Sequence, residues 1–290
     1  MNLAARLRRL VLRWYRRHGR DLPWRRAHDP YAVLVSEIML QQTQVSRVIP
    51  KYRAFLKRFP SVRALARAHL RDVLRCWSGL GYNRRARNLW QCARDVMARH
   101  GGRIPSEIDA LQSLPSIGRY TAGAVASFAF GAREAAVDTN VRRVLSRAML
   151  GIDRADDATA WRLAFDVLPK DAATWNHALM DIGAMFCRAK PACAECPLRG
   201  ACAFRRRGVG RVNSTATRRQ GAFEGSRRQQ RGRVIRALVD ARSMDLMRLG
   251  PQVKVGFGKS DLPWLQELLL DLERDGLVAL NRTRTRAALP

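Results

Sequence analysis

The sequence predicts an all-α fold for roughly its first two thirds, followed by a small basic module of helices and short strands. Three observations support this fold class. Apolar residues recur at helical spacing across nearly all of residues 1–187. No alternating strand pattern occurs in that region. The breaks between the helical patterns are short and rich in glycine, as at residues 79–81 and 101–102.

The predicted helices start at the N-terminal end of the chain, where apolar residues from Leu3 to Trp14 share one face. This start is rich in arginine and poor in acids, as mitochondrial transit peptides are, but we interpret it as the first helix of the mature fold. Asp29 and Pro30 pair a capping residue with a proline, which predicts a helix start. Further helices are expected at residues 31–42, 44–57, 70–77, 83–100, 119–130, 138–149 and 171–187.

The composition changes near residue 204. Residues 204–230 are rich in Arg, Gln, Gly, Ser and Thr, which is typical of a linker or of a segment that contacts phosphates. Two helical patterns follow at 229–242 and 262–275, and a strand-like run follows at 277–280. The basic residues 282–286 are expected to form a mobile tail.

These patterns predict three parts. Residues 1–205 form the main domain, residues 206–228 a basic linker, and residues 229–290 a small winged-helix-like α/β module. No run of 18 apolar residues occurs, so we expect no membrane-spanning segment and no membrane partner.

Charge is the strongest compositional signal. Arg and Lys number 54 against 24 acidic residues, which gives a net charge of +30. Such an excess is typical of proteins that bind a polyanion: DNA, RNA or an acidic membrane surface. An arginine-rich proteome is the alternative explanation for part of the excess.

The six cysteines fall into two groups. Cys76 and Cys92 stand alone in helical patterns and are expected to be buried thiols. The other four crowd together, separated by five, two and five residues: Cys187, Cys193, Cys196 and Cys202. In a chain with no secretion signal such a crowd predicts a metal site. Only one C-x2-C pair is present, which favours one [4Fe–4S] cluster over the alternative, a zinc ion.

This cysteine spacing resembles that of the endonuclease III and MutY-type DNA glycosylases, which have six residues in the first gap where this chain has five. The resemblance covers about residues 5–205 and implies a two-lobed helix-hairpin-helix fold. Residues 114–122, Leu-Pro-Ser-Ile-Gly-Arg-Tyr-Thr-Ala, are similar to the hairpin of that superfamily, usually L-P-G-[IV]-G. Ser116 replaces the first glycine and would have to adopt a positive φ. Gly118 and Arg119 are expected to contact a phosphate.

Asp138 begins the helical pattern of residues 138–149, where it is expected to be the N-cap. The resemblance makes it the catalytic aspartate, acting electrostatically or through a transient covalent bond, with Asn140 beside it at the DNA. Tyr120 stands where relatives that cleave the strand have lysine. With no amine there, we expect a monofunctional enzyme.

Residues 36–44, Ser-Glu-Ile-Met-Leu-Gln-Gln-Thr-Gln, closely resemble the active-site helix of MutY-type adenine glycosylases. The resemblance implies that Glu37 is a general acid that protonates adenine at N7, and that Gln41 and Gln42 belong to the segment that wedges into the opened duplex. Thymine-specific relatives usually lack this Gln-Gln pair.

Four more positions fit the same family. Trp24 and Arg25 match residues that line the base pocket, and Tyr82 of the G-L-G-Y loop matches a residue that reaches the partner strand. His177 stands where relatives often have Gln or Glu near the base.

The resemblance implies excision of adenine opposite 8-oxoguanine or guanine, leaving an abasic site. Its substrate would be double-stranded DNA that contains a mismatch or an oxidised base, and the protein would be a monomer in the cytoplasm, associated with the nucleoid. The chain lacks room for the Nudix-like domain that reads 8-oxoguanine in many relatives. A thymine or uracil mismatch glycosylase, a non-catalytic iron–sulfur DNA-binding protein and an electron carrier remain alternatives.

Overall fold

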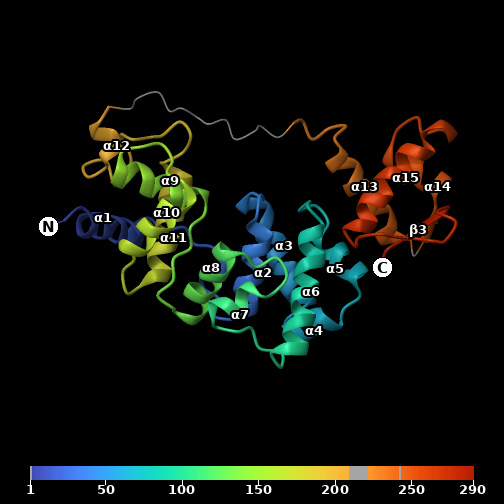
Figure 1. Cartoon of the computed structure of the whole chain (residues 1–290), viewed down its shortest axis with the longest axis horizontal. Coiled ribbons are helices and arrows are strands. Elements are labelled where there is room, and N and C mark those ends of the chain that lie inside the picture. The colour runs from blue at the N-terminus through green and yellow to red at the C-terminus, as the bar shows by residue number, and fades with distance from the viewer. Residues whose placement is uncertain (1, 209–220, 242) are drawn as a thin grey trace. The chain divides into compact units, whose positions relative to one another are not determined.

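The computed structural model describes residues 2–208, 221–241 and 243–290, and it is mostly helical (Figure 1). The expected linker at 206–228 therefore lies partly outside the described residues. Within the described ranges, no helix is both long and apolar enough to cross a membrane. The chain divides into two compact units, and each unit draws on separate stretches of sequence.

The first unit contains Met1–Glu37, Ser106–Ser113 and Ile117–Arg219. Its elements follow the expected positions closely, and α7, α10 and α12 are additions. They are α1 (Leu3–His18), the start of α2 (Pro30–Leu40), α7 (Ile108–Gln112), α8 (Arg119–Phe130), α9 (Thr139–Leu145), α10 (Asp157–Asp166), α11 (Ala172–Met185) and α12 (Ala203–Arg206). A short 3-10 turn spans Pro23–Arg25, and a π-helical turn at Ser146–Leu150 extends α9.

The core of this unit forms where α1, α9, α10 and α11 present their apolar faces to one another. Leu7 and Val11 of α1 meet Trp161 of α10 and Trp175 of α11 there, and all four are buried. Apolar spacing of three and four residues made α1, α9 and α11 predictable from the sequence, whereas α10 was not predicted.

The start of α2 also follows the sequence. The Asp29 carboxylate accepts hydrogen bonds from the backbone N–H of Tyr31 and Ala32, so the predicted cap is confirmed. Beyond the cap, nearly every side chain of α2 is buried. A helix that is apolar all round is a core helix, and any polar residue on it is placed inside the protein.

The second unit contains Ile38–Pro105, Leu114–Ser116 and Gln220–Pro290. Its first part comprises the end of α2, α3 (Val45–Arg58), α4 (Val62–Arg67), α5 (Leu70–Trp77) and α6 (Arg84–Arg99). Cys92 is buried as expected, but Cys76 is only partly buried, so the expectation for Cys76 was wrong. Cys76 lies near the end of α5, on the less enclosed side of that helix.

The C-terminal part of this unit comprises α13 (Arg227–Asp240), β1 (Ser243–Asp245), α14 (Leu246–Val253), α15 (Leu262–Arg274), β2 (Ala279–Leu280) and β3 (Arg286–Ala288). The strands form an antiparallel sheet in the order β1-β3-β2, with Ala288 paired to both Ser243 and Ala279. Leu238 and Leu268 form part of the apolar interior of its helices.

The prediction of a mobile tail at residues 282–286 is wrong. The segment is the turn between β2 and β3: the Asn281 side-chain oxygen accepts hydrogen bonds of 2.9 Å from the N–H groups of Thr285 and Arg286. The strands on either side have only two and three residues, too few for an alternating pattern to reveal them.

Candidate active site

A buried carboxyl group, that of Glu37, lies at the centre of the candidate site. Glu37 is on α2 and only 5% exposed. The Tyr120 hydroxyl, from the first turn of α8, donates a hydrogen bond of 2.7 Å to Glu37 Oε2. Burial raises the pKa of Glu37 to about 7, and the charge of Asp138 adds to the rise, while the Tyr120 hydrogen bond and Arg25 lower it. Glu37 can therefore hold or release a proton near neutral pH.

The second carboxylate, that of Asp138, is the N-cap of α9, as the sequence predicted. Its Oδ1 accepts a hydrogen bond of 2.7 Å from the N–H of Val141, and its Oδ2 accepts one of 2.8 Å from Asn140 Nδ2. Burial raises the pKa of Asp138, and these hydrogen bonds and the charge of Arg143 oppose the rise. The helix N-terminus also favours the ionised form.

Two glycines allow the backbone around Asp138 to pack closely. A Cβ at Gly183 of α11 would lie 2.5 Å from the Cβ of Asn140, and a Cβ at Gly123 of α8 would lie 2.2 Å from the carbonyl oxygen of Ala135. No side chain fits at either position without movement of the backbone. The start of α9 is therefore held between α11 and the segment that precedes it.

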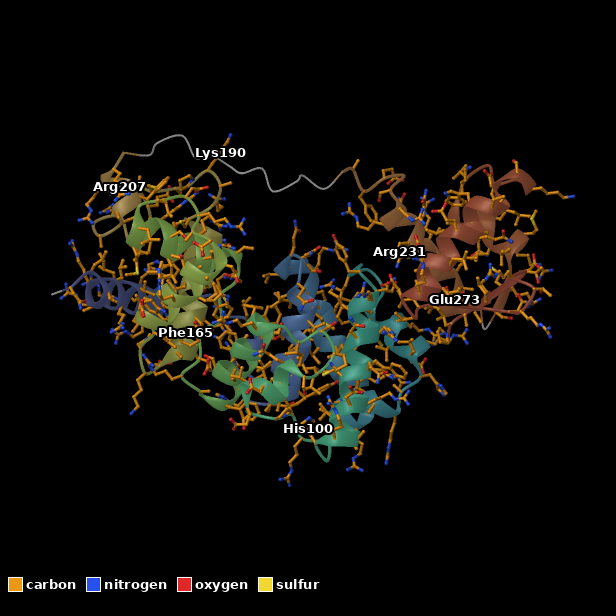
Figure 2. All side chains as sticks on the ribbon, viewed as in Figure 1. His100, Phe165, Lys190, Arg207, Arg231 and Glu273 are labelled. Carbon is orange, nitrogen blue, oxygen red and sulfur yellow. The ribbon has the colours of Figure 1, made fainter. Side chains whose placement is uncertain are left out.

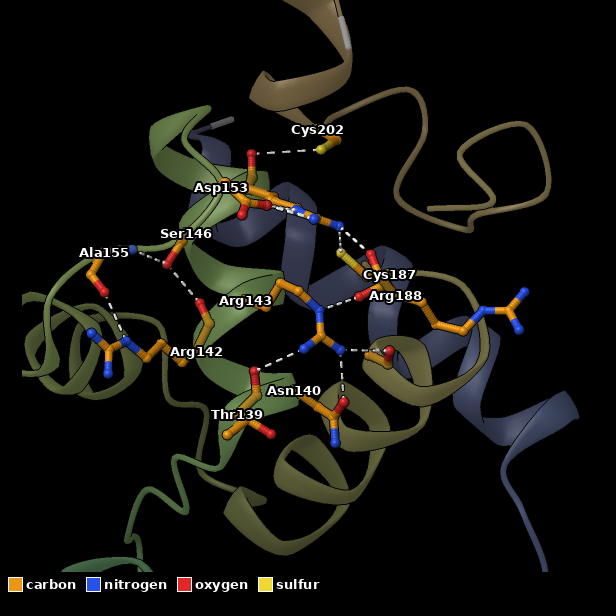
Figure 3. Close-up of polar contacts among 12 residues, drawn as sticks. Thr139, Asn140, Arg142, Arg143, Ser146, Asp153, Ala155, Cys187, Arg188 and Cys202 are labelled. Carbon is orange, nitrogen blue, oxygen red and sulfur yellow. Dashed lines mark hydrogen bonds and ion pairs between the residues drawn. The ribbon is translucent and has the colours of Figure 1, made fainter. Parts of the chain in front are cut away.

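A network of arginine contacts joins α9 to the cysteine segment (Figure 3). Arg143 Nη2 donates hydrogen bonds to Asn140 Oδ1 at 2.7 Å and to the carbonyl oxygen of Gly183 at 3.0 Å, and its Nε donates to the carbonyl oxygen of Cys187. Arg147 lies deeper, with its Nη1 3.6 Å from the Cys187 sulfur. Its Nε donates to the Asp153 carboxylate at 2.9 Å. The sequence analysis singled out neither arginine, because the chain has so many that one more carried no signal.

Arg25 is held by a carboxylate that the sequence analysis did not select. Its two terminal nitrogens donate to the two oxygens of Asp181 at 2.7 and 2.8 Å, and Arg20 Nε donates to the same carboxylate at 2.6 Å. Burial acts to raise the pKa of Asp181, but the hydrogen bonds and charge of Arg25, with help from Arg20, lower it overall. Asp181 is fully buried and stays ionised, so it fixes the guanidinium of Arg25.

Of the two other expected pocket residues, Trp24 is buried and His177 is partly buried. Trp24 is 5% exposed. The ring of His177 stacks on Phe128, with centroids 3.9 Å apart and planes at 22°. Burial, and then the charge of Arg25, lowers the pKa of His177 to about 3. Its imidazole is therefore neutral near pH 7.

The four clustered cysteines line one small cavity, together with Arg147, Phe186, Pro191, Arg199, Phe204 and Arg205. Burial raises the pKa of Cys187 and of Cys196. Across the described part of the chain, no three His, Cys, Asp or Glu side chains are close enough together to hold a single metal ion. The four thiols thus surround one common space.

The hairpin before α8 adopts the conformation expected of it. Ser116 has a φ of 64°, the value that a glycine would adopt without strain. Asn88 donates a hydrogen bond to its hydroxyl. Gly118 is the N-cap of α8, and the guanidinium of Arg119 lies 3.9 Å from the centre of the Trp161 ring.

The residues expected to wedge into DNA belong to the second unit. Gln41 and Gln42 follow α2, and Tyr82 ends the 79–82 turn; Gln42 and Tyr82 have positive φ values of 54° and 48°. Arg85, which the sequence analysis missed, joins the two segments. It donates to the carbonyls of Ile38 at 2.9 Å, of Gly81 at 3.3 Å and of Gln41. A guanidinium at the carbonyl end of α2 satisfies groups that would otherwise lack partners.

Comparison with known proteins matches residues 35–167 to the HhH-GPD superfamily of base excision DNA repair proteins. An adenine DNA glycosylase of Mycolicibacterium smegmatis is 44% identical over 239 residues, which cover 80% of each chain. That of Mycobacterium tuberculosis is 43% identical over 296 aligned residues, covering 97% of this chain and 92% of the relative. The Homo sapiens adenine DNA glycosylase is 43% identical over 68% of this chain, but over 39% of its own length.

Solved structures show the same fold. A thermostable thymine-DNA glycosylase superposes with a TM-score of 0.66 and 29% identity, covering 71% of this chain and 97% of the other. Endonuclease III in a DNA complex superposes with a TM-score of 0.62 and 22% identity, covering 72% of this chain and all of the other. The sequence identity to adenine glycosylases exceeds that to either of these proteins.

Proposed function

Because the chain belongs to the MutY-type adenine DNA glycosylases of the HhH-GPD superfamily, we propose that Glu37 is its general acid and that Asp138 stabilises the cationic sugar. The protein is an adenine DNA glycosylase that acts in base excision repair. One observation carries the assignment of roles: a buried Glu37 carboxyl group with a pKa near 7, hydrogen-bonded to Tyr120.

The first step needs a proton. Adenine leaves poorly as an anion, and a base extruded from the duplex reaches the enzyme with N7 available. Glu37 donates its proton to N7, which makes the base a better leaving group. The Tyr120 hydroxyl orients the carboxyl group and helps to set its pKa, and we include Tyr120 in the proposed catalytic site as the residue that positions Glu37.

The second step creates positive charge on the deoxyribose. The Asp138 carboxylate stabilises the oxocarbenium-like state electrostatically. Hydrogen bonds to both of its oxygens support this role, because they hold the carboxylate in place and oppose the rise in pKa that burial causes. Water then attacks the sugar carbon, its proton passes to the Glu37 carboxylate that the first step ionised, and an abasic site is left. Tyr120 supplies no amine, so the enzyme does not cleave the strand.

The base pocket uses Trp24, Arg25 and His177. The fixed guanidinium of Arg25 provides hydrogen-bond donors, and the neutral imidazole of His177 can donate or accept. Trp24 provides a flat apolar wall.

Cys187, Cys193, Cys196 and Cys202 would hold one [4Fe–4S] cluster. Four cysteines around a common cavity, with arginines beside it, support a shared metal centre, and the presence of only one C-x2-C pair favours a cluster over a zinc ion. The bound group would shape the loop that carries the basic residues. Iron analysis tests this assignment: about four irons per chain are expected, and stoichiometric zinc without iron would exclude it.

Double-stranded DNA containing a mismatch or an oxidised base is the proposed partner. Ser116, Gly118 and Arg119 would position one phosphate at the start of α8, with Asn140 near the same strand. Gln41, Gln42 and Tyr82 would hold open the gap that the extruded base leaves. The charge of +30 supports an affinity that depends strongly on salt.

The C-terminal module, residues 229–290, resembles a winged helix in its order of helices and strands. We place it as a separate part after the main domain 1–205 and the linker 206–228. The opposing base is 8-oxoguanine or guanine. The protein acts as a monomer in the cytoplasm, at the nucleoid.

A single-turnover assay on four duplexes tests the function. Duplexes of the same sequence that carry an A:8-oxoG, A:G, T:G or U:G pair are each incubated with excess enzyme, and release of the base is measured. Adenine should be excised from the first two duplexes only. If the protein removed only thymine or uracil, the fold assignment would be unaffected and the adenine specificity would be overturned.

A further inference from the structure

A groove of about 550 Å³ in the first unit has no role in the mechanism above. Helix α1 forms one wall, and residues 195–200 of the cysteine segment form the other. The walls are tied together where Arg6 Nη2 donates a hydrogen bond of 3.0 Å to the carbonyl oxygen of Gly200. Lys190, a cation of the same segment that Figure 2 labels, does not line the groove. The groove is therefore built by α1 and the last part of the cysteine segment.

Positive charge dominates the lining of this groove, which includes four arginines: Arg6, Arg13, Arg17 and Arg199. None of the four pairs with a carboxylate in residues 2–208, 221–241 and 243–290. Among the described residues of the lining, Glu195 is the one acid, so positive charges exceed negative ones by three. Cations held close together repel one another, and an anion bound between them relieves the repulsion. The groove therefore favours an anionic ligand.

The remaining surface of the groove is largely apolar. Leu10 and Trp14 alternate with the arginines on α1, and Pro197 lies on the opposite wall; all three are half-buried. The Trp14 ring already has aromatic neighbours. It stacks on His18 with centroids 6.0 Å apart, and it meets Phe186 edge-on with centroids 5.6 Å apart. The groove thus combines guanidinium groups with a small, mainly aliphatic contact surface.

This combination suits an acidic peptide better than a nucleic acid. Single-stranded nucleic acid gains affinity in a basic groove when its bases stack on aromatic rings, but Trp14 is already engaged with His18 and Phe186. Phosphates alone would leave Leu10 and Pro197 without an apolar partner. An extended peptide supplies both kinds of contact, because its successive side chains point to opposite sides. The volume is in the ordinary range for a ligand-binding cleft.

The spacing of the arginines on α1 agrees with an extended peptide. Arg13 and Arg17 are one turn apart, which is about 6 Å along the helix axis. Alternate residues of an extended chain are about 6.7 Å apart. Two carboxylates at alternate positions can therefore each meet one guanidinium, while the side chain between them points toward the wall that carries Pro197.

We propose that this groove binds a short acidic segment of a partner protein, in which acidic and apolar residues alternate. None of the residues that line the groove belongs to the proposed catalytic site or to the base pocket. A partner bound there therefore holds the enzyme without occupying the residues that act on the base.

A titration with synthetic peptides tests the proposal. The full-length, iron-containing protein is titrated against a fluorescein-labelled peptide of sequence Asp-Leu-Asp-Leu-Asp, and polarisation is measured at physiological salt. The two comparison peptides are Asp-Ser-Asp-Ser-Asp, which keeps the charge, and Asn-Leu-Asn-Leu-Asn, which keeps the apolar side chains. Wild type should bind each of them at least about 10-fold more weakly than the first peptide, because each lacks one of the two contacts.

Two double variants of α1 locate the binding site. Arg13→Ala/Arg17→Ala should weaken binding of the first peptide by about 10-fold, since an exposed ion pair contributes about 3-fold to an affinity. Arg9→Ala/Arg16→Ala is the matched control: both arginines are exposed on the same helix but do not line the groove. It removes the same charge and should change binding by less than about 2-fold. Both variants should excise adenine at the wild-type single-turnover rate.

Three results would overturn the proposal. The first is equal binding of the three peptides by wild type, and the second is an equal loss in the two double variants. The third concerns undamaged duplex DNA: if it displaces the peptide, and if Arg13→Ala/Arg17→Ala loses more DNA affinity than the control variant, the groove belongs to the DNA interface. Melting temperature and iron content show whether each variant is folded. If one is not, the peptide series and the DNA displacement on wild type decide.

Discussion

Replacing Glu37 by glutamine should make the protein more stable at high pH and almost inactive. Glutamine keeps the size of the side chain and can still accept a hydrogen bond from Tyr120, but it does not ionise. The rise of the Glu37 pKa from 4.5 to about 7 corresponds to about 3 kcal/mol. This is the free energy that the buried carboxylate costs the folded state once it is ionised.

The sign of the pH dependence follows from proton binding. Between pH 4.5 and 7 the folded protein keeps a proton on Glu37 that the unfolded chain has released. The contribution of Glu37 to the free energy of unfolding is therefore intact below pH 4.5 and is lost as the pH rises through about 7. In Glu37→Gln this loss disappears. The free energy of unfolding of the variant, relative to wild type, should grow by about 3 kcal/mol from pH 4.5 to pH 8.

The assay combines urea unfolding with single-turnover excision on an A:G duplex, both measured across that pH range. Wild-type excision should fall about tenfold per pH unit above pH 7, as the protonated fraction of Glu37 declines, and Glu37→Gln should lose at least about 10²-fold at neutral pH. Glu224→Gln is the control: its side chain is 82% exposed, and its stability should follow that of wild type. A stability difference between Glu37→Gln and wild type that does not change with pH would refute the reasoning.

Four further predictions follow from the same contacts. Tyr120→Phe removes a hydrogen bond that lowers the pKa of Glu37, so the high-pH limb of the excision profile should move to higher pH. Asp138→Asn keeps an N-cap, so thermal unfolding should change little while excision falls by about 10²-fold or more. Gly183→Ala places a Cβ 2.5 Å from a side-chain carbon at the start of α9 and should lower the free energy of unfolding by about 1–3 kcal/mol. Arg85→Ala should lower the free energy of binding to abasic-site duplex DNA, measured by titration, more than it lowers the free energy of unfolding, measured by melting. Binding equal to that of wild type would contradict the role of Arg85.

Much of the fold could be predicted because local patterns determine it. The start of α2 follows from its capping residue Asp29 and from Pro30. The bounds of α5 and α8 follow from apolar spacing and from the glycines nearby, such as Gly131 at the end of α8. The helix α14 was not predicted because Gly250 and Pro251 interrupt its pattern. The helices α4, α7 and α12 were not predicted because four to six residues contain too few turns to show a period. The same limit explains the missed turn between β2 and β3.

The carboxylates of the site were visible for a different reason. Glu37 stands in an almost wholly apolar helix, and Asp138 stands at a helix start, so each is conspicuous locally. Asp181 and Arg85 are not, because their importance comes from partners far away in the sequence. Arg25 and Asp181 are 156 residues apart, and Arg85 lies 44 residues from Gln41. No local spacing in the sequence indicates such a pair, and only the folded structure shows that the two residues are in contact.

The pKa of Glu37 depends on opposing effects: burial raises it, and two neighbouring side chains lower it. Burial alone would keep the carboxyl group protonated well above neutral pH, where it would be too weak an acid to protonate adenine. The Tyr120 hydroxyl and the charge of Arg25 act against burial and bring the pKa to about 7. Arg25 can do this only because Asp181 holds it in place, and Asp181 is ionised because Arg20 and Arg25 both bind it. Arg20 and Asp181, which lie outside the proposed base pocket, therefore act through Arg25 on how readily the catalytic acid gives up its proton.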